Sequence, residues 1–135
     1  MEGGKLSVPV LLYARTDAPS GTRLKQFLVT GLSGVEVETY ETLEDLSRRF
    51  SQPLQDPSVA ILLFTDGDEL VETLPIRHRF QDISLVLIVP NRDPETIARA
   101  HQLRPRFLTD LQNDLTAVTA VVEKMLKIKA GRSNP

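Results

Sequence analysis

The stretch Val59-Ala60-Ile61-Leu62-Leu63-Phe64-Thr65 is apolar almost throughout and is followed at once by Asp66. A second apolar run, Leu85 to Val89, precedes Pro90, and a shorter run ends at Thr109. Such continuous runs predict strands that are buried on both faces, as in a parallel sheet covered by helices. In these sheets, ligands and catalytic groups lie at the carboxyl ends of the strands. The residues expected at those ends are Ala14, Arg15, Asp66, Pro90 and Thr109.

The rest of the chain alternates between strand-like and helix-like segments. Residues 35–40 alternate polar and apolar side chains, which predicts a strand with one wetter face near a sheet edge. We expect strands at 8–13, 35–40, 59–65, 85–89 and 107–108, and a loop at 52–58. This alternation predicts one α/β domain in which right-handed crossovers place helices on both faces of a parallel sheet.

The helices expected between these strands are marked by their ends. The first helix carries Leu24, Phe27 and Leu28 and stops at Gly31, and the second is capped by Thr42 and buries Leu43, Leu46 and Phe50. The third, over 69–74, is interrupted by Pro75, and the fourth starts at Asp93-Pro94-Glu95. The last helix is capped by Thr109 with Gln112, and its apolar face consists of Leu111, Leu115, Val118, Val122 and Met125. These are the usual start and stop signals of helices.

Composition excludes several classes of function. The 135 residues carry a formal charge of −2, which argues against a nucleic-acid partner, and contain no cysteine, which excludes disulfides and thiolate chemistry. The apolar runs are far shorter than the roughly 20 residues that span a bilayer, and no apolar segment follows the first five residues to form a secretory signal. We expect a single cytoplasmic domain over residues 1–135, with a core of about 7–129 and a flexible tail at 130–135.

The order and spacing of these segments resemble the receiver domain of bacterial two-component response regulators, over roughly residues 7–129. The best local match runs from Leu85 to Thr109 and includes an aromatic residue, Phe107, on the fifth strand. The resemblance implies a flavodoxin-like (βα)5 fold, a three-layer sandwich around a five-stranded parallel sheet.

Receivers hold magnesium on an acidic pair after the first strand, and Ala14 and Arg15 stand there in this chain. The phosphoacceptor aspartate is matched by Asp66. The hydroxyl residue after the fourth strand is replaced by Pro90, and the lysine after the fifth by Thr109 or Asp110. Of these five positions, only that of Asp66 keeps the residue type that receivers use.

Phosphoryl transfer depends on positioning and on neutralising the charge of the transferred group. Magnesium held by one carboxylate would bind weakly, and Arg15 would repel it. The resemblance therefore implies a degenerate pseudo-receiver that is neither phosphorylated nor an enzyme, without metal or cofactor. We further hypothesise that the Arg15 guanidinium occupies the place of the metal and pairs with Asp66.

Receivers engage protein partners or a second copy through the face of the fourth helix, the fifth strand and the last helix. The residues that the resemblance places on this face are Arg99, Gln102, Arg106, Phe107 and Gln112. The expected function is thus that of a protein–protein interaction module, with an unidentified protein or a homodimer as partner, and with no nucleic acid or membrane.

Three alternatives remain open at this stage. The chain can be a working response regulator that is phosphorylated on Asp66, with Asp17 helping to hold the metal. It can be a small-molecule enzyme that uses the same crevice. The segment from Leu11 to Gly21 also resembles the opening of glutaredoxin-like proteins, with Ala18 and Gly21 in place of the two cysteines.

Three further motifs have ordinary structural explanations. Asp66-Gly67-Asp68-Glu69 lacks the twelve-residue frame of a calcium loop and is expected to form a polar turn. His78 and His101 lack ligand spacing and are expected to be surface side chains. Arg77-His78-Arg79, together with Arg104 and Arg106, can bind an anionic partner, but a solvated face is the commoner meaning of such a cluster.

Overall fold

The computed structural model describes residues 10–15, 18–32, 34–51, 59–113 and 115–133. Within them lies a sheet of five parallel strands in the order β2-β1-β3-β4-β5. The strands are β1 (Val10–Tyr13), β2 (Val37–Tyr40), β3 (Val59–Leu63), β4 (Ser84–Val89) and β5 (Phe107–Asp110). The α/β class, the parallel sheet and the edge position of β2 are thereby confirmed.

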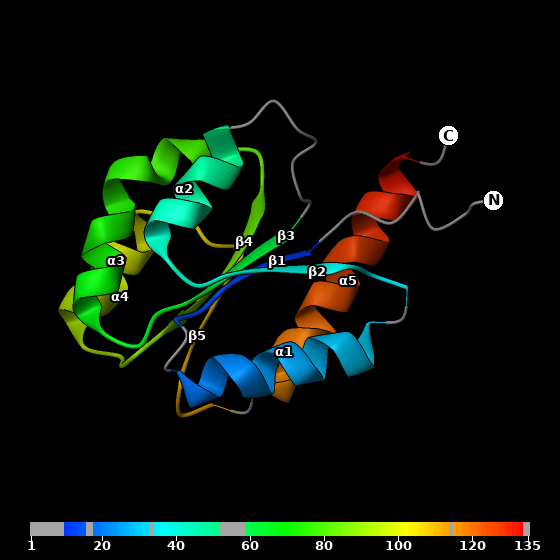
Figure 1. The fold of residues 1–135 in the computed structure, drawn as a ribbon, viewed down its shortest axis with the longest axis horizontal. Coiled ribbons are helices and arrows are strands. Elements are labelled where there is room, and N and C mark those ends of the chain that lie inside the picture. Colours follow the sequence, from blue (N-terminus) through cyan, green and yellow to red (C-terminus); the bar gives the residue numbers. More distant parts are fainter. Residues whose placement is uncertain (1–9, 16–17, 33, 52–58, 114, 134–135) are drawn as a thin grey trace.

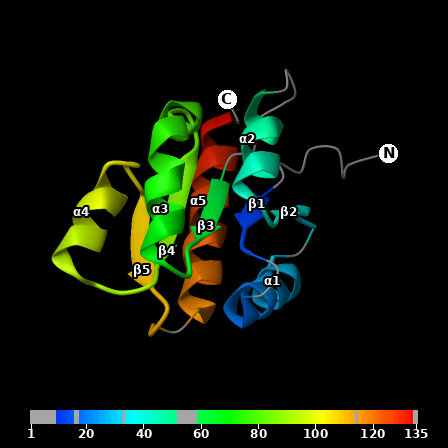
Figure 2. The same cartoon turned by 60° about the vertical axis from the view of Figure 1, so that its left-hand side comes forward.

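The helices form a layer on each face of the sheet (Figures 1 and 2). Helices α1 (Pro19–Gly31) and α5 (Thr116–Ser133) cover one face; α2 (Leu43–Ser51), α3 (Gly67–Thr73) and α4 (Pro94–His101) cover the other. None of the helices in the described part of the chain is long and apolar enough to cross a membrane.

Alternate side chains of each strand enter different cores. Leu62 and Leu87 pack towards α2, α3 and α4, whereas Ile61 and Val86 pack towards α1 and α5. All five residues of β3 are fully buried. Burying one such aliphatic side chain contributes about 1.5–3 kcal/mol, so these runs specify the centre of the sheet.

The second helix begins as its sequence indicates, because the Thr42 hydroxyl oxygen accepts a hydrogen bond from the Asp45 N–H at 3.1 Å. Helix α2 is also tied to the edge strand β2 by an ion pair between Arg49 and Glu38 at 3.0 Å. Pro94 opens α4 as predicted, but the preceding Asp93 makes no capping hydrogen bond with its side chain.

One predicted helix boundary is confirmed and another is wrong. The third α-helix ends at Thr73, and Pro75 lies in the first turn of the 3₁₀ helix η2 (Leu74–Phe80) that follows, so the proline interrupts the α-helix as predicted. Thr109 and Gln112 do not cap the last helix, which starts only at Thr116. The ladder between β4 and β5 extends to the pair Val89–Asp110, and this tertiary pairing overrides the local capping signal.

The shift at the end of β5 leaves Leu111 in the connection before α5, where it is partly buried, and not on the helix. Helix α5 then runs to Ser133, so residues 131–133 are helical and do not belong to a tail. Residues 8, 9, 16, 17 and 52–58, on which parts of the first strand, the alternative metal ligand and a loop were expected, lie outside the described residues.

Candidate functional site at the carboxyl edge of the sheet

Asp66 lies at the start of α3, three residues beyond the last residue of β3, Leu63. Its Oδ1 accepts a hydrogen bond from the Glu69 N–H at 3.0 Å, so the carboxylate acts as the helix N-cap. Its Oδ2 accepts a hydrogen bond from Arg15 Nη1 at 3.1 Å. Both oxygens of the expected phosphoacceptor are therefore engaged by the protein itself.

The ion pair hypothesised from the sequence is thus present between Arg15 and Asp66. Their side chains remain 41% and 49% exposed, respectively, and a pair so accessible to water contributes about 1 kcal/mol at most. The pair matters more for its charge, since a guanidinium stands next to the carboxylate that a receiver would use with magnesium.

Ala14 lies between β1 and the start of α1, where the two elements approach closely. A Cβ added to Gly21 would lie 2.5 Å from the Ala14 Cβ, which is closer than two carbon atoms can pack without one of them moving. The first helix can lie this close to the strand end only because position 21 is glycine and position 14 carries a single methyl group.

A second carboxylate, that of Glu69, lies buried beside Asp66. Glu69 is only 4% exposed. Its Oε2 accepts a hydrogen bond from the Tyr13 hydroxyl at 2.5 Å. Its Oε1 accepts two hydrogen bonds from Thr65, from the backbone N–H at 2.8 Å and from the hydroxyl at 2.9 Å. Burial, together with the bond to Glu69, raises the pKa of the Tyr13 hydroxyl far above its usual range. The hydroxyl therefore keeps its proton and serves as a donor.

Sequence reasoning missed Glu69, although a signal was present. Asp66-x-x-Glu69 is the spacing of a capping box, in which the first side chain accepts from the N3 amide and the N3 carboxylate reaches back. Here it reaches back to Thr65, one residue earlier than usual. The polar turn expected at this segment is therefore a capped helix start.

Asp110, not Thr109, is the last residue of β5 and lies opposite Val89, the last residue of β4. Its side chain, 5% exposed, forms an ion pair with Arg92 and accepts a hydrogen bond from the Gln112 N–H at 2.8 Å. At one of the two positions expected to replace a receiver's lysine, this chain therefore has a buried, paired carboxylate. Arg92 is a further residue that the sequence interpretation did not single out.

The remaining expected residues lie at the same edge without joining the Arg15–Asp66 pair. Pro90 follows β4 and is half-buried. Thr109 is buried in β5, and its hydroxyl accepts a hydrogen bond from Asn113 Nδ2 at 3.0 Å. The described residues contain no group of three or more acids and histidines placed to hold a metal ion.

Helix α4 and the edge strand β5 lie side by side (Figure 2). Of the residues expected on a partner face, Arg99 lies on α4, Phe107 on β5, Gln102 and Arg106 in the connection between them, and Gln112 after β5. Gln102, Arg106 and Gln112 are exposed. Phe107 is half-buried against the core under α1 and α5, while Arg99 lies 3.8 Å from Glu95 in an ion pair on α4. The structure therefore offers the three polar side chains to solvent and holds the aromatic ring largely inside.

A scan against protein families found no match, and neither did a search of the curated proteins. Among solved structures, the chain resembles a CheY-like response regulator from Mesorhizobium loti, with a TM-score of 0.67, 16% identity and coverage of 88% of this chain and 98% of that one. It also resembles an orphan response regulator of H. pylori (TM-score 0.65, 16% identity, 87% and 96% covered). A third is a CheY-like protein from Pseudomonas aeruginosa PAO1 (TM-score 0.63, 15% identity, 87% and 98% covered). The chain therefore has the CheY-like fold of response regulator receiver domains.

Proposed function

We propose that this protein is a signalling module of receiver fold that acts by binding another protein and is not switched by phosphorylation. The observation that carries the proposal is the contact between Arg15 and Asp66, 3.1 Å apart. It puts a fixed positive charge beside the carboxylate that would otherwise accept the phosphoryl group.

The charges around Asp66 support the absence of phosphorylation. Magnesium binds through carboxylate and other oxygen ligands; Asp66 already accepts two hydrogen bonds, and the buried Glu69 accepts three. At the end of β5, the carboxylate of Asp110 is paired with Arg92, so this residue does not supply the positive charge with which a lysine would attract a phosphoryl group. Catalysis of phosphoryl transfer rests on such stabilisation of charge.

The decisive experiment is a titration of the labelled protein with magnesium, with and without beryllofluoride, followed by backbone amide NMR. We expect no saturable shifts near Ala14, Asp66 and Asp110 at millimolar magnesium. Saturable shifts at these positions would instead identify a working response regulator that accepts a phosphoryl group on Asp66.

A repaired variant makes this negative result informative. Arg15→Asp, Pro90→Thr and Asp110→Lys together restore an acid, a hydroxyl and a lysine at the positions where receivers use them. We expect this triple variant to respond to magnesium with beryllofluoride when the wild-type chain does not. The same spectra report whether the variant remains folded.

The proposed partner surface is the exposed part of α4 and β5 together with Gln102 and Arg106, which lie in the connection between them. Sedimentation equilibrium tests whether the partner is a second copy. A homodimer across this surface predicts a mass that rises with concentration, and Arg106→Glu should reduce the association because it reverses the charge of a side chain at the contact. A monomer at every concentration would assign the surface to a different protein.

A further inference from the structure

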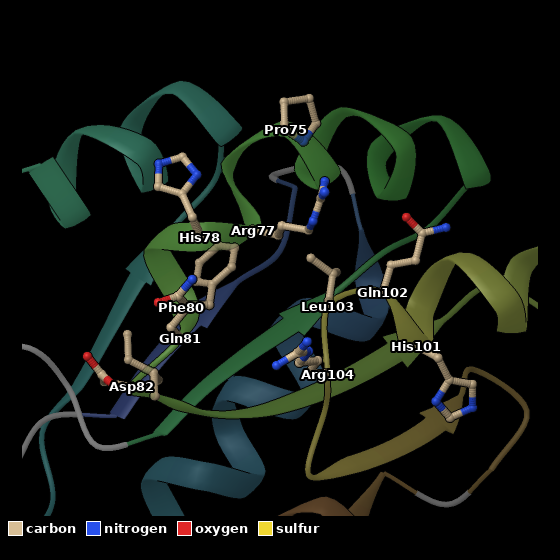
Figure 3. Close-up of a pocket in the computed structure, with 11 residues that line it drawn as sticks. Pro75, Arg77, His78, Phe80, Gln81, Asp82, His101, Gln102, Leu103 and Arg104 are labelled. Atoms are coloured by element: carbon tan, nitrogen blue, oxygen red, sulfur yellow. The ribbon is translucent and has the colours of Figure 1, made fainter.

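A pocket of about 930 Å³ opens between η2 and the end of α4 (Figure 3). Its lining includes Asp82 and Ile83, just before β4, and Arg104, shortly before β5. The pocket therefore lies at the amino ends of these strands, whereas Asp66 and Asp110 lie at the carboxyl edge. Strand β4 has six residues, so the two sites are separated by roughly 20 Å at about 3.3 Å per residue.

The pocket combines an apolar floor with a basic rim. Phe80, Ile83 and Leu103 are buried and form the floor. Arg77 and Arg104 are exposed on the rim. In Figure 3 these two arginines lie on either side of Leu103. The fold thus places Arg77 and Arg104, which are far apart in sequence, beside the same apolar surface.

Neither guanidinium has an acidic partner among the described residues. Arg77 donates one hydrogen bond, to the backbone carbonyl of Leu74 at 3.0 Å. Arg104 forms no ion pair in that part of the chain. One acid, Asp82, lines the pocket. The pocket is therefore locally positive on a chain whose formal charge is −2.

Arg104 also has an unusual backbone. Its φ is 56°, and it is the one non-glycine residue of the described chain with a positive φ. This left-handed conformation follows α4, where glycine is the usual residue, and it costs an arginine roughly 1 kcal/mol. The chain thus places a guanidinium at the rim in a position that local backbone energetics disfavour.

The end of α4 helps to distinguish between anionic ligands. His101 and Gln102, at the carboxyl end of this helix, line the pocket, and the partial negative charge there opposes a compact phosphate group. A peptide suits this arrangement better, because its carboxylates can meet the two arginines separately. An apolar side chain of such a peptide can cover the floor.

We propose that the pocket binds an acidic peptide segment of a protein partner, with an apolar side chain of that segment resting on Phe80 and Leu103 and its carboxylates on Arg77 and Arg104. The inference builds on the proposed role in protein binding and names the chemistry of the partner. Gln102 belongs both to this pocket and to the surface on α4 and β5, so one partner can span the two.

The test uses an array of labelled peptides that combine Asp and Glu with single Leu or Phe residues. Each peptide is paired with a counterpart in which Asn and Gln replace the acids, and affinities are measured by fluorescence polarisation. We expect the acidic peptides to bind more tightly than their counterparts, and added salt to weaken the binding because these charges are exposed to solvent.

The variant Arg104→Gly separates binding from folding, since glycine relieves the backbone strain while removing the guanidinium. We expect it to raise the Kd of the acidic peptides by about tenfold, the size expected for one charge-assisted hydrogen bond. Arg77→Gln should act similarly. The matched control is Arg23→Gln on the exposed side of α1, which removes one positive charge from the other layer and should change the Kd by less than about twofold.

Three results would overturn the assignment: equal binding of the acidic and amide peptides, no binding of any peptide on the array, or equal affinities for Arg104→Gly and Arg23→Gln. Pyrophosphate is included as a competitor. If it binds directly and Arg104→Gly abolishes that binding while the peptides fail, the pocket belongs to a phosphate ligand. The response to magnesium and beryllofluoride concerns Asp66 alone, so the two proposals fail separately.

Discussion

The two edges of the sheet differ in whether their charged side chains form ion pairs within the protein. At the carboxyl edge, charges are paired within the protein: Arg15 with Asp66 and Arg92 with Asp110. At the amino edge, Arg104 has no acidic partner among the described residues and lines an open pocket. The comparison shows that charges at the carboxyl edge are neutralised within the protein, whereas Arg104 at the amino edge is exposed, and this difference is the basis of the ligand proposed for the pocket.

The strongest test of the stabilising role is Glu69→Ala. Removing this carboxylate leaves the Tyr13 hydroxyl and the Thr65 N–H without their acceptor, and we expect the free energy of unfolding to fall by about 3 kcal/mol. Urea unfolding followed by circular dichroism measures the change. The exposed Glu72 on the same helix provides the control, and Glu72→Ala should change stability by less than about 0.5 kcal/mol. Equal effects of the two substitutions would contradict a stabilising role of the buried Glu69 carboxylate at the carboxyl edge.

Alkaline pH probes the same cluster through Tyr13. The pKa of this hydroxyl is raised in the folded protein above its usual value of 10.0, so the unfolded chain loses the proton first. The stabilisation is complete below pH 10 and is lost as the pH rises above it, by about 1.4 kcal/mol per pH unit while the folded hydroxyl stays protonated. Unfolding curves measured from pH 9 to 11 give the free energy of unfolding at each pH. In Tyr13→Phe, this part of the decrease in unfolding free energy with pH should be absent. If the free energy of unfolding decreased with pH equally in the variant and the wild type, the effect could not be assigned to Tyr13.

A smaller effect is expected at Asp66 itself. Asp66→Ala removes the N-cap of α3 as well as the pair with Arg15, and should cost about 1 kcal/mol. A double-mutant cycle with Arg15→Ala isolates the pair, whose coupling energy should stay below about 1 kcal/mol because both side chains are partly exposed. A coupling of several kcal/mol would contradict the view that this exposed pair contributes little to stability.

The smallest effect is expected at the amino edge, with the opposite sign. Arg104→Gly relieves the positive φ but adds freedom to the unfolded chain, and we expect a net gain of about 0.5 kcal/mol. Arg106→Gly, in a position without a positive φ, should lower stability instead. Thermal unfolding of the two variants gives the comparison, and a loss of stability in Arg104→Gly would argue that its side chain supports the fold.

Sequence patterns were sufficient for the fold because the buried strands carry strong, local signals. The run from Val59 to Leu63 had to lie at the centre of a parallel sheet, and Arg15 and Asp66 followed neighbouring strands, so their contact was foreseeable. The end of β5 was not foreseeable in this way. Thr109 with Gln112 is a good local capping signal, and it lost to the pairing of Asp110 with Val89 across the sheet.

The sequence by itself determined the succession of strands and helices and the residue types at positions 14, 15 and 90, because these are properties of local residue order. The tertiary structure alone decided that Glu69 is buried and that Asp110 pairs with Arg92. It also decided that Arg77 and Arg104 share one pocket. These outcomes depend on distances between segments far apart in the chain, which packing and hydrogen bonding fix only when the sheet and its two helical layers are assembled.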